Sequence, residues 1–284
     1  MQRLTYINPN GESVVLGNSR PYILAHIDGT GGVQADIRST QSPYQDGSSV
    51  VAVQMPNRLV TLTGTVMAGS REEMYELRRR LSRVLNPKLG AGRLVYENDY
   101  RSYAADAIPD EAPVFTNRFS NHHGFTASFT CPDPFWRDVE EATKDLKSLT
   151  GGLTFPLKLG TRFALIGYRG VFENEGDVET PIRIRYTGPA VNPVVENETT
   201  GEYIKINTTL AATDVLEITT AFGRKRVEVV AADGSRTNVF HWIDLGSTFF
   251  GLQPGENILK YSSDNAEDDI STVTVYWNNR YGGA

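Results

Sequence analysis

Few residues in this chain have the chemistry of a catalytic site. The 284 residues include four histidines and one cysteine, Cys131. A serine hydrolase needs a serine, a histidine and a carboxylate brought together, and no histidine lies in a Gly-x-Ser-x-Gly motif. Cys131 precedes a proline and has no base nearby in the sequence, which favours a structural thiol over a nucleophile. We predict no enzymatic activity and no catalytic residue.

Metal and cofactor sites also lack support. His122 and His123 are adjacent, so in a strand they face opposite ways, and no third ligand is evident. The acidic pairs Glu140-Glu141 and Asp268-Asp269 are interpreted as solvated; glycosidase carboxylates come from separate strands, so spacing leaves that reaction unsupported rather than excluded. We expect neither a metal nor another cofactor.

Three aromatic residues leave two interpretations open. Trp242, Trp277 and Tyr281 could form a sugar-stacking platform on a β-sandwich. Core packing is the commoner fate of a tryptophan in a strand. The alternative function is a carbohydrate-binding protein that acts through these residues.

Neither a glycine cluster nor a basic run predicts binding to phosphate. Asp28-Gly29-Thr30-Gly31-Gly32 lacks the Lys-Ser/Thr pair of a phosphate loop, and no helix pattern follows, so we interpret it as a turn. Arg78-Arg79-Arg80 with Arg83 is interpreted as the solvated face of a helix. The net charge of -6 and the pI near 5.4 argue against the basic footprint of a nucleic-acid binder.

Composition indicates an ordinary globular protein, with 39% hydrophobic and 22% charged residues. The length predicts about two domains, each with its own core. A single cysteine excludes an internal disulfide framework and fits folding in a reducing cytoplasm. The sequence shows neither a signal peptide nor an apolar stretch of the roughly 18 residues needed to span a bilayer.

The first half predicts strands, one helix and one ambiguous segment. Asn10-Gly11 predicts a hairpin turn between strands at 4–7 and 14–16. Ser70 and Glu73 predict a helix start, and Asn86-Pro87 its end. The segment from Val33 to Ser49 is polar and rich in turn residues, so it fits an extended hairpin arm or a loose loop. Further strands are predicted at 22–27, 58–66, 92–97, 101–106 and 124–130.

The second half predicts only strands, in the pattern of a sandwich or jelly roll. They are expected within 163–172 and at 182–186, 194–197, 203–206, 215–218, 226–230, 239–242 and 272–277. The charged segment after the first half fits a linker. We predict an N-terminal domain at 1–137, a linker at 138–152 and a C-terminal domain at 153–284.

The stretch Cys131-Pro132-Asp133-Pro134-Phe135-Trp136 is predicted to be a rigid corner. Its two prolines each lack an N–H and fix φ, so they end a helix or a central strand. Phe135 and Trp136 follow at once, and we expect both side chains to be buried where the strand leaves the first domain.

The whole layout resembles the distal tail protein (Dit) family of long, non-contractile-tailed bacteriophages. The resemblance extends over nearly the full chain and rests on the order and spacing of several motifs. In the first half these are 58–66, the helix end at 81–87, the strand at 94–96 and the corner at 131–136; in the second they are 172–177 with Thr180-Pro181, 192–197 with 199–202, 252–257 and the strand at Trp277.

This resemblance implies a mainly β fold: an N-terminal β-sandwich with one covering helix and an extended hairpin arm, and a galectin-like or jelly-roll C-terminal sandwich. It implies a structural hub at the distal tip of the virion tail, synthesised in the bacterial host cytoplasm. In the family, N-terminal domains form a homo-hexamer, as single or stacked rings, through an extended β-hairpin arm. The best candidate for that arm is Val33 to Ser49.

The implied partners are the major tail or tube protein, a tail-associated lysin or hub protein and a receptor-binding protein, with no membrane. The sandwich fold of the second domain does not by itself imply sugar binding. DNA is expected to pass through the ring without specific binding. An acidic chain would suit such a channel, because phosphate repels carboxylate.

Overall fold

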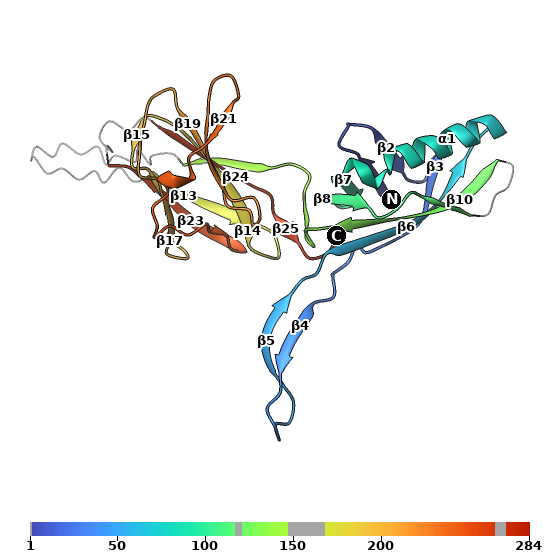
Figure 1. Ribbon diagram of the computed structural model, residues 1–284, viewed down its shortest axis with the longest axis horizontal. Coiled ribbons are helices and arrows are strands. Elements are labelled where there is room, and N and C mark those ends of the chain that lie inside the picture. The colour runs from blue at the N-terminus through green and yellow to red at the C-terminus, as the bar shows by residue number, and fades with distance from the viewer. Residues whose placement is uncertain (1, 117–120, 147–167, 265–270) are drawn as a thin grey trace, which may run out of the picture. The chain divides into compact units, whose positions relative to one another are not determined.

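A computed structural model describes residues 2–116, 121–146, 168–264 and 271–284. The chain divides into two compact units (Figure 1): unit 1 comprises Met1–Val139 with Arg280–Ala284, and unit 2 comprises Glu140–Asn279. No helix among the described residues is both long and apolar enough to cross a membrane.

Unit 1 is built mainly from antiparallel strands, with one α-helix packed against them from outside. The principal sheet has the order β2-β1-β7-β8-β10-β6-β3, with β9 paired to β10 and β11 paired to β8 and β25. The strands are β1 (Arg3–Ile7), β2 (Ser13–Leu16), β3 (Tyr22–Asp28), β4 (Asp36–Thr40), β5 (Ser49–Gln54), β6 (Arg58–Met67), β7 (Gly92–Glu97), β8 (Ser102–Pro109), β9 (Val114–Thr116), β10 (His122–Cys131), β11 (Trp136–Asp138) and β25 (Arg280–Tyr281); the helices are α1 (Arg71–Val84) and the short 3-10 helix η1 (Pro87–Leu89).

The sheet of unit 1 bends around a common core. Tyr6 on β1 and Phe129 on β10 are not on neighbouring strands, yet their ring centroids lie 5.1 Å apart. The two ends of the sheet also meet, because Gly17, just after β2, forms an isolated bridge with Ile23 on β3. The two halves of the predicted sandwich therefore join along both sides into a closed, barrel-like body.

The predicted helix and hairpin are confirmed. Ser70 caps α1 by accepting a hydrogen bond from the Glu73 N–H at 3.2 Å, and the helix ends before Asn86-Pro87. The Glu73 carboxylate accepts from the N–H of Gly69 rather than that of Ser70. Met74, Leu81 and Val84 are buried against the core. The residues between β1 and β2 form the expected turn, with Gly11 at a φ of 82°.

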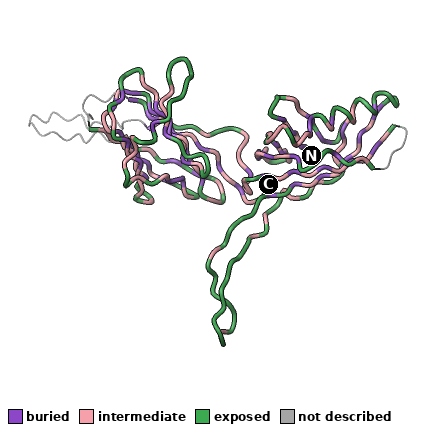
Figure 2. The backbone as a smooth tube through the Cα atoms, in the orientation of Figure 1, coloured by how far each residue is buried: buried purple, intermediate pink, exposed green. Residues whose placement is uncertain are grey.

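One hairpin of unit 1 stands apart from the rest of its unit. Strands β4 and β5 pair only with each other among the described residues, and we call residues 33–57 the arm. Nearly every arm residue is exposed, as the green colouring in Figure 2 shows. The arm continues past Ser49, the predicted limit, because β5 extends to Gln54 and supplies the second strand.

Unit 2 is a β-sandwich. One sheet has the order β12-β24-β14-β19-β20-β21 with β22 paired to β14, the other has the order β13-β23-β16-β17, and β15 pairs with β18. A continuous apolar core includes Phe172, Ile184 and Val275. The elements are β12 (Ala142–Leu146), β13 (Tyr168–Asn174), β14 (Thr180–Thr187), β15 (Ala190–Val191), β16 (Val194–Asn197), β17 (Glu202–Lys205), β18 (Thr209–Leu210), β19 (Val215–Thr219), β20 (Arg226–Val230), β21 (Arg236–Asn238), η2 (Phe240–Trp242), β22 (Gly251–Leu252), β23 (Gly255–Ser262) and β24 (Thr272–Trp277).

Three sequence predictions differ from the structure. The predicted linker contains β12, which pairs with β24; residues 147–167, which include its remainder and the predicted start of the second domain, lie outside the described residues. Residues 280–284 belong to unit 1 rather than to the C-terminal domain. The predicted strand at 239–242 is a 3-10 turn, because Asn238 Oδ1 accepts the Phe240 N–H and starts the turn there.

Gly64 on β6 gives a first testable prediction. A Cβ at this position would lie 2.6 Å from the Ile23 carbonyl oxygen and 2.7 Å from the Phe125 ring. Overpacking of this kind costs about 1–3 kcal/mol, so Gly64→Ala is expected to lower the denaturation midpoint of unit 1 in urea. Gly17→Ala is the control, because its Cβ would meet only Arg3 Cγ, at 3.8 Å. Equal midpoints for the two variants would contradict the prediction.

Candidate assembly interface

The arm carries an apolar face that is open to solvent. Ile37 on β4 lies opposite Val53 on β5, and Val51, two residues before Val53, is the extra residue where the register shifts between Arg38 and Ser39. These three side chains are 60%, 60% and 67% exposed. β-branched residues suit a strand, but exposing them to water is unfavourable, and the described residues of this chain leave more than half of each side chain uncovered.

The arm ends in an ordered turn. Gln45 holds the tip together, because its Oε1 accepts from the Ser42 N–H at 3.0 Å and its Nε2 donates to Ser49 Oγ at 3.2 Å. Tyr44 stands fully exposed at this turn with a φ of 67°. A large aromatic residue on an ordered turn can bind a partner with little loss of conformational entropy.

Arg58, the first residue of β6, anchors the root of the arm. Its side chain is only 1% exposed. Nη1 donates to the carbonyl oxygens of Gly29, at 2.6 Å, and Gly31, which both lie where the chain leaves β3 for the arm. Nε donates to the Pro134 carbonyl at 2.7 Å. A guanidinium offers five N–H donors in a rigid fork, so one side chain fixes several backbone segments at once.

The predicted corner completes this root. Trp136 is fully buried, its indole N–H donates to the Thr30 carbonyl at 3.0 Å, and the Arg58 guanidinium lies 5.4 Å from its ring centroid. Phe135 is half-buried beneath the guanidinium of Arg280, 4.5 Å from the ring centroid. The expected burial is confirmed for Trp136 and holds in part for Phe135. The glycine cluster at 28–32 is the turn that leads into the arm, with Gly29 at a φ of 85°.

Cys131 lies beside this root as a buried thiol, opposite Arg58 in the strand register. Burial raises the pKa of Cys131 to about 11 from an ordinary 9.0, and Arg58 partly offsets the increase. At pH 7 about one Cys131 side chain in ten thousand is therefore ionised to the thiolate. This environment is that of a structural thiol.

Cys131 supplies a second prediction. A colorimetric thiol reagent at pH 7 is expected to react at least about 100-fold more slowly with the native chain than with the chain in denaturant. The folded state favours the neutral thiol. The stability that Cys131 contributes is therefore complete below pH 9, the thiol's ordinary pKa, and is lost as the pH rises through about 11, its pKa in the folded chain. Equal rates with and without denaturant would contradict the buried environment.

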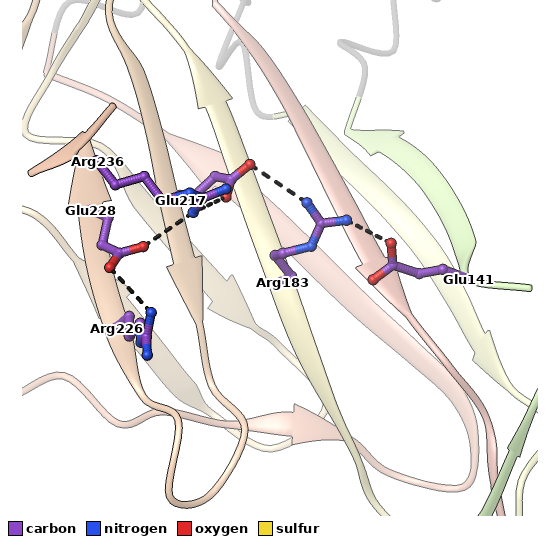
Figure 3. Close-up of polar contacts among 6 residues, drawn as sticks. All are labelled: Glu141, Arg183, Glu217, Arg226, Glu228 and Arg236. Atoms are coloured by element: carbon purple, nitrogen blue, oxygen red, sulfur yellow. Dashed lines mark hydrogen bonds and ion pairs between the residues drawn. The ribbon is translucent and has the colours of Figure 1, made fainter. Parts of the chain in front are cut away.

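A chain of ion pairs crosses one sheet face of unit 2 (Figure 3). Arg183 on β14 contacts Glu141 at 2.6 Å and Glu217 at 3.5 Å. Arg236 on β21 contacts Glu217 at 2.8 Å and Glu228 at 3.1 Å, and Arg226 continues the chain to Glu228 at 3.6 Å. Each carboxylate has a guanidinium partner, so the network ties strands together and does not resemble an acid–base pair. Glu141, predicted to be solvated, is thus paired; Asp268-Asp269 lies outside the described residues.

The three aromatics of the alternative sugar-binding interpretation do not share one environment. Trp277 and Tyr281 are 8% and 7% exposed, and they belong to unit 2 and unit 1 respectively. Trp242 is half-buried against the core of unit 2. Trp277 lines an open cleft of about 370 Å³ with Lys144 and Glu173, but most of its ring is covered by the core. Trp277 and Tyr281 thus pack in cores and offer little ring surface, whereas Trp242 keeps part of its side chain exposed.

The remaining candidates have structural contacts. Arg78 lies over the Phe115 ring at 4.3 Å, and Arg83 pairs with Glu12 at 3.0 Å, so the basic run packs against its own unit as well as facing solvent. His123 is buried and His122 half-buried on opposite sides of β10. No cluster of three or more His, Cys, Asp or Glu residues suited to a metal ion occurs in the described part of the chain.

Two family models match the chain, and together they span most of both units. The phage tail protein RIFT-related domain matches residues 9–131, and the C-terminal domain of the siphovirus-type tail component matches residues 175–281. The chain belongs to the distal tail protein family of siphovirus-type tail components. The resemblance inferred from the motifs is confirmed.

Solved structures of phage tail components share this fold. The SPP1 Dit protein, described as a paradigm of the hub adsorption apparatus in phages that infect Gram-positive bacteria, matches with a TM-score of 0.67 at 14% identity, over 99% of each chain. A chain of the phage P2 baseplate in its activated conformation with Ca matches with a TM-score of 0.58 at 12% identity, over 100% of this chain and 99% of that one. A chain of the corresponding baseplate with Sr matches with a TM-score of 0.58 at 13% identity, over the same shares of the two chains. No curated protein sequence matches closely enough to count as a relative.

The charge of this family member is divided unevenly. Of the 28 Lys and Arg residues 15 lie in unit 1, and of the 34 Asp and Glu residues 14 do. Unit 1 is thus nearly neutral, and unit 2 carries the negative charge of the chain. The net negative charge of the chain therefore does not support an acidic DNA channel, because this charge lies in unit 2 and the ring is predicted to be formed by unit 1.

Sequence reasoning missed Arg58 as the anchor of the arm. Its position carried a signal: in a strand whose buried side holds Val60 and Leu62, the period of two places residue 58 on the same side. A charged residue on a buried face requires partners. The partners are backbone carbonyls from segments distant in the chain, which no sequence pattern identifies.

Proposed function

We propose that this chain is a non-enzymatic hub of the phage tail tip, in which six copies form a ring through their arms. The observation that carries the proposal is the arm itself, a two-stranded ribbon with its apolar face exposed. An isolated hairpin is marginally stable in water, and three or more strands or a packed face are needed to stabilise it. A neighbouring copy would supply that face.

Ring closure follows from the kind of contact. The arm of one copy would pack on a different surface of the next copy, and a heterologous contact of this kind, when repeated, gives a ring if the rotation closes. The solved structures with the same fold come from a hub adsorption apparatus and from a baseplate. Their architecture supports an oligomeric role, and the number six comes from the family resemblance.

The proposed position is the distal end of the tail. Unit 1 would continue the tail tube and contact the major tail protein and a tail-associated lysin or hub protein, and unit 2 would hold a receptor-binding protein. DNA would pass through the ring without specific binding, which is consistent with the near neutrality of unit 1.

Immunogold electron microscopy on particles of the phage that encodes this chain tests the position. Antibodies against the purified protein are expected to label the tail end distal to the capsid, and negative-stain images of the purified protein are expected to show six-membered rings. Labelling restricted to the capsid or along the whole tail would contradict the proposal.

A further inference from the structure

Residues 280–284, which we call the return segment, follow all of unit 2 in the chain but lie in unit 1. Their strand β25 pairs with β11, placing Tyr281 opposite Trp136. Arg280 Nη2 lies 2.6 Å from Asp133 Oδ1, and the same guanidinium covers the Phe135 ring. Tyr281 packs edge-on against Tyr103 with the ring centroids 5.4 Å apart. The return segment is therefore fixed to the corner that ends unit 1's main part.

The return segment also completes the root of the arm. Arg58 Nη2 donates to the Gly282 carbonyl at 2.6 Å, while Nη1 of the same guanidinium holds Gly29 and Gly31. The Ala284 N–H donates to the Thr30 carbonyl at 2.9 Å. One buried guanidinium thus bridges the arm root and the return segment, and a second hydrogen bond joins the two segments directly.

These contacts depend on one another. A buried guanidinium is tolerated only when its donors are satisfied, and an unpaired buried donor or charge is unfavourable. Without the return segment, Arg58 Nη2 would lose the Gly282 carbonyl as its acceptor, and the Thr30 carbonyl would lose the Ala284 N–H, one of its two donors. The guanidinium would then tend to leave its buried position for water and release Gly29 and Gly31.

We propose that Arg58 is the positioning residue of the arm and that it acts only after the return segment has docked. The return segment is synthesised after every residue of unit 2. A growing chain therefore cannot fix its arm for ring assembly until unit 2 has been made. This control by completion of unit 2 deepens the proposed function and rests on it only for the consequence in assembly. The coupling between the arm and the return segment stands by itself.

Spin-label distances test the coupling in the full-length protein. Labels at Tyr44→Cys on the arm tip and Tyr75→Cys on α1 report the position of the arm within unit 1; both native side chains are exposed, and the native thiol of Cys131 is buried. The experiment uses the Ile37→Asp/Val53→Asp background, which is expected to remain monomeric. The parent protein should give a narrow distance distribution.

Tyr281→Ala and Arg58→Lys are each expected to broaden that distribution at least about twofold. The Tyr281 side chain packs on Tyr103, so its truncation is expected to loosen the return segment, and a lysine cannot reproduce the donor fork of arginine. Tyr276→Ala, which changes a residue of β24 in unit 2, is the control and should leave the distribution narrow. If Tyr281→Ala does not fold, Arg280→Gln, which removes the ion pair with Asp133, takes its place.

The outcomes separate the two proposals. A narrow distribution in a folded return-segment variant, or a broad one in the parent, would overturn the coupling. Broadening in both variants with reduced ring formation in the assembly-competent background would support the complete proposal. If the variants broaden the distance distribution but the unmodified protein never forms rings, the coupling between arm and return segment is supported. The ring function and the control of assembly are then both rejected.

Discussion

Ile37→Asp/Val53→Asp is expected to abolish ring assembly while both units remain folded. The two side chains face each other across the arm and are each 60% exposed in the single chain. Burying such a pair on a neighbouring copy contributes about 2–4 kcal/mol. Its loss weakens each contact about 30- to 1,000-fold, and burying two unpaired carboxylates adds a further penalty.

Sedimentation velocity measures the result directly as the fraction of protein in the ring. Val171→Asp/Leu245→Asp is the matched control, because it places the same two charges on exposed apolar residues of unit 2. Assembly of the control together with a monomeric arm variant would support the arm as the interface. Rings formed equally well by both variants would show that the arm is not the contact.

Trp136→Ala is expected to have the largest effect on the stability of a single chain. The side chain is fully buried, packs against Tyr96 at 6.0 Å between ring centroids, and donates its indole N–H to Thr30. Truncation of a buried tryptophan costs about 3–5 kcal/mol. Because the residue lies in the core of unit 1, the loss should fall on that unit.

Denaturant titration followed by hydrogen exchange resolves the two units. The exchange midpoint of β6 and β10 should move to lower denaturant, and that of β14 and β24 should remain in place. Trp242→Ala removes a half-buried tryptophan from unit 2. It should lower the exchange midpoint of β14 and β24 by a smaller amount and leave that of β6 and β10 in place. A loss below about 1 kcal/mol in unit 1 for Trp136→Ala would be inconsistent with the packing seen at the corner.

Features that depend on local chemistry were predictable from the sequence. The helix cap at Ser70, the Asn10-Gly11 turn and the alternating strand β6 follow from neighbouring residues, and the structure confirms all three. Trp136 was expected to be buried for the same reason. The motifs also identified the family, which the two family models confirm.

Features that depend on contacts between distant segments were not predictable. The arm was ambiguous because its first strand and tip are polar, and its apolar strand β5 was not included in the segment. The return of residues 280–284 to unit 1 leaves no trace in composition. Trp277 and Tyr281 were open to core packing, the commoner fate, or to a surface platform, and only the folded chain shows that both are buried.

The molar mass of the purified protein tests the central claim most directly. Size-exclusion chromatography with light scattering over a range of concentrations should show a species of six times the 31.4 kDa chain, in exchange with the monomer at low concentration. A mass of 31.4 kDa at every concentration would contradict an arm-mediated ring.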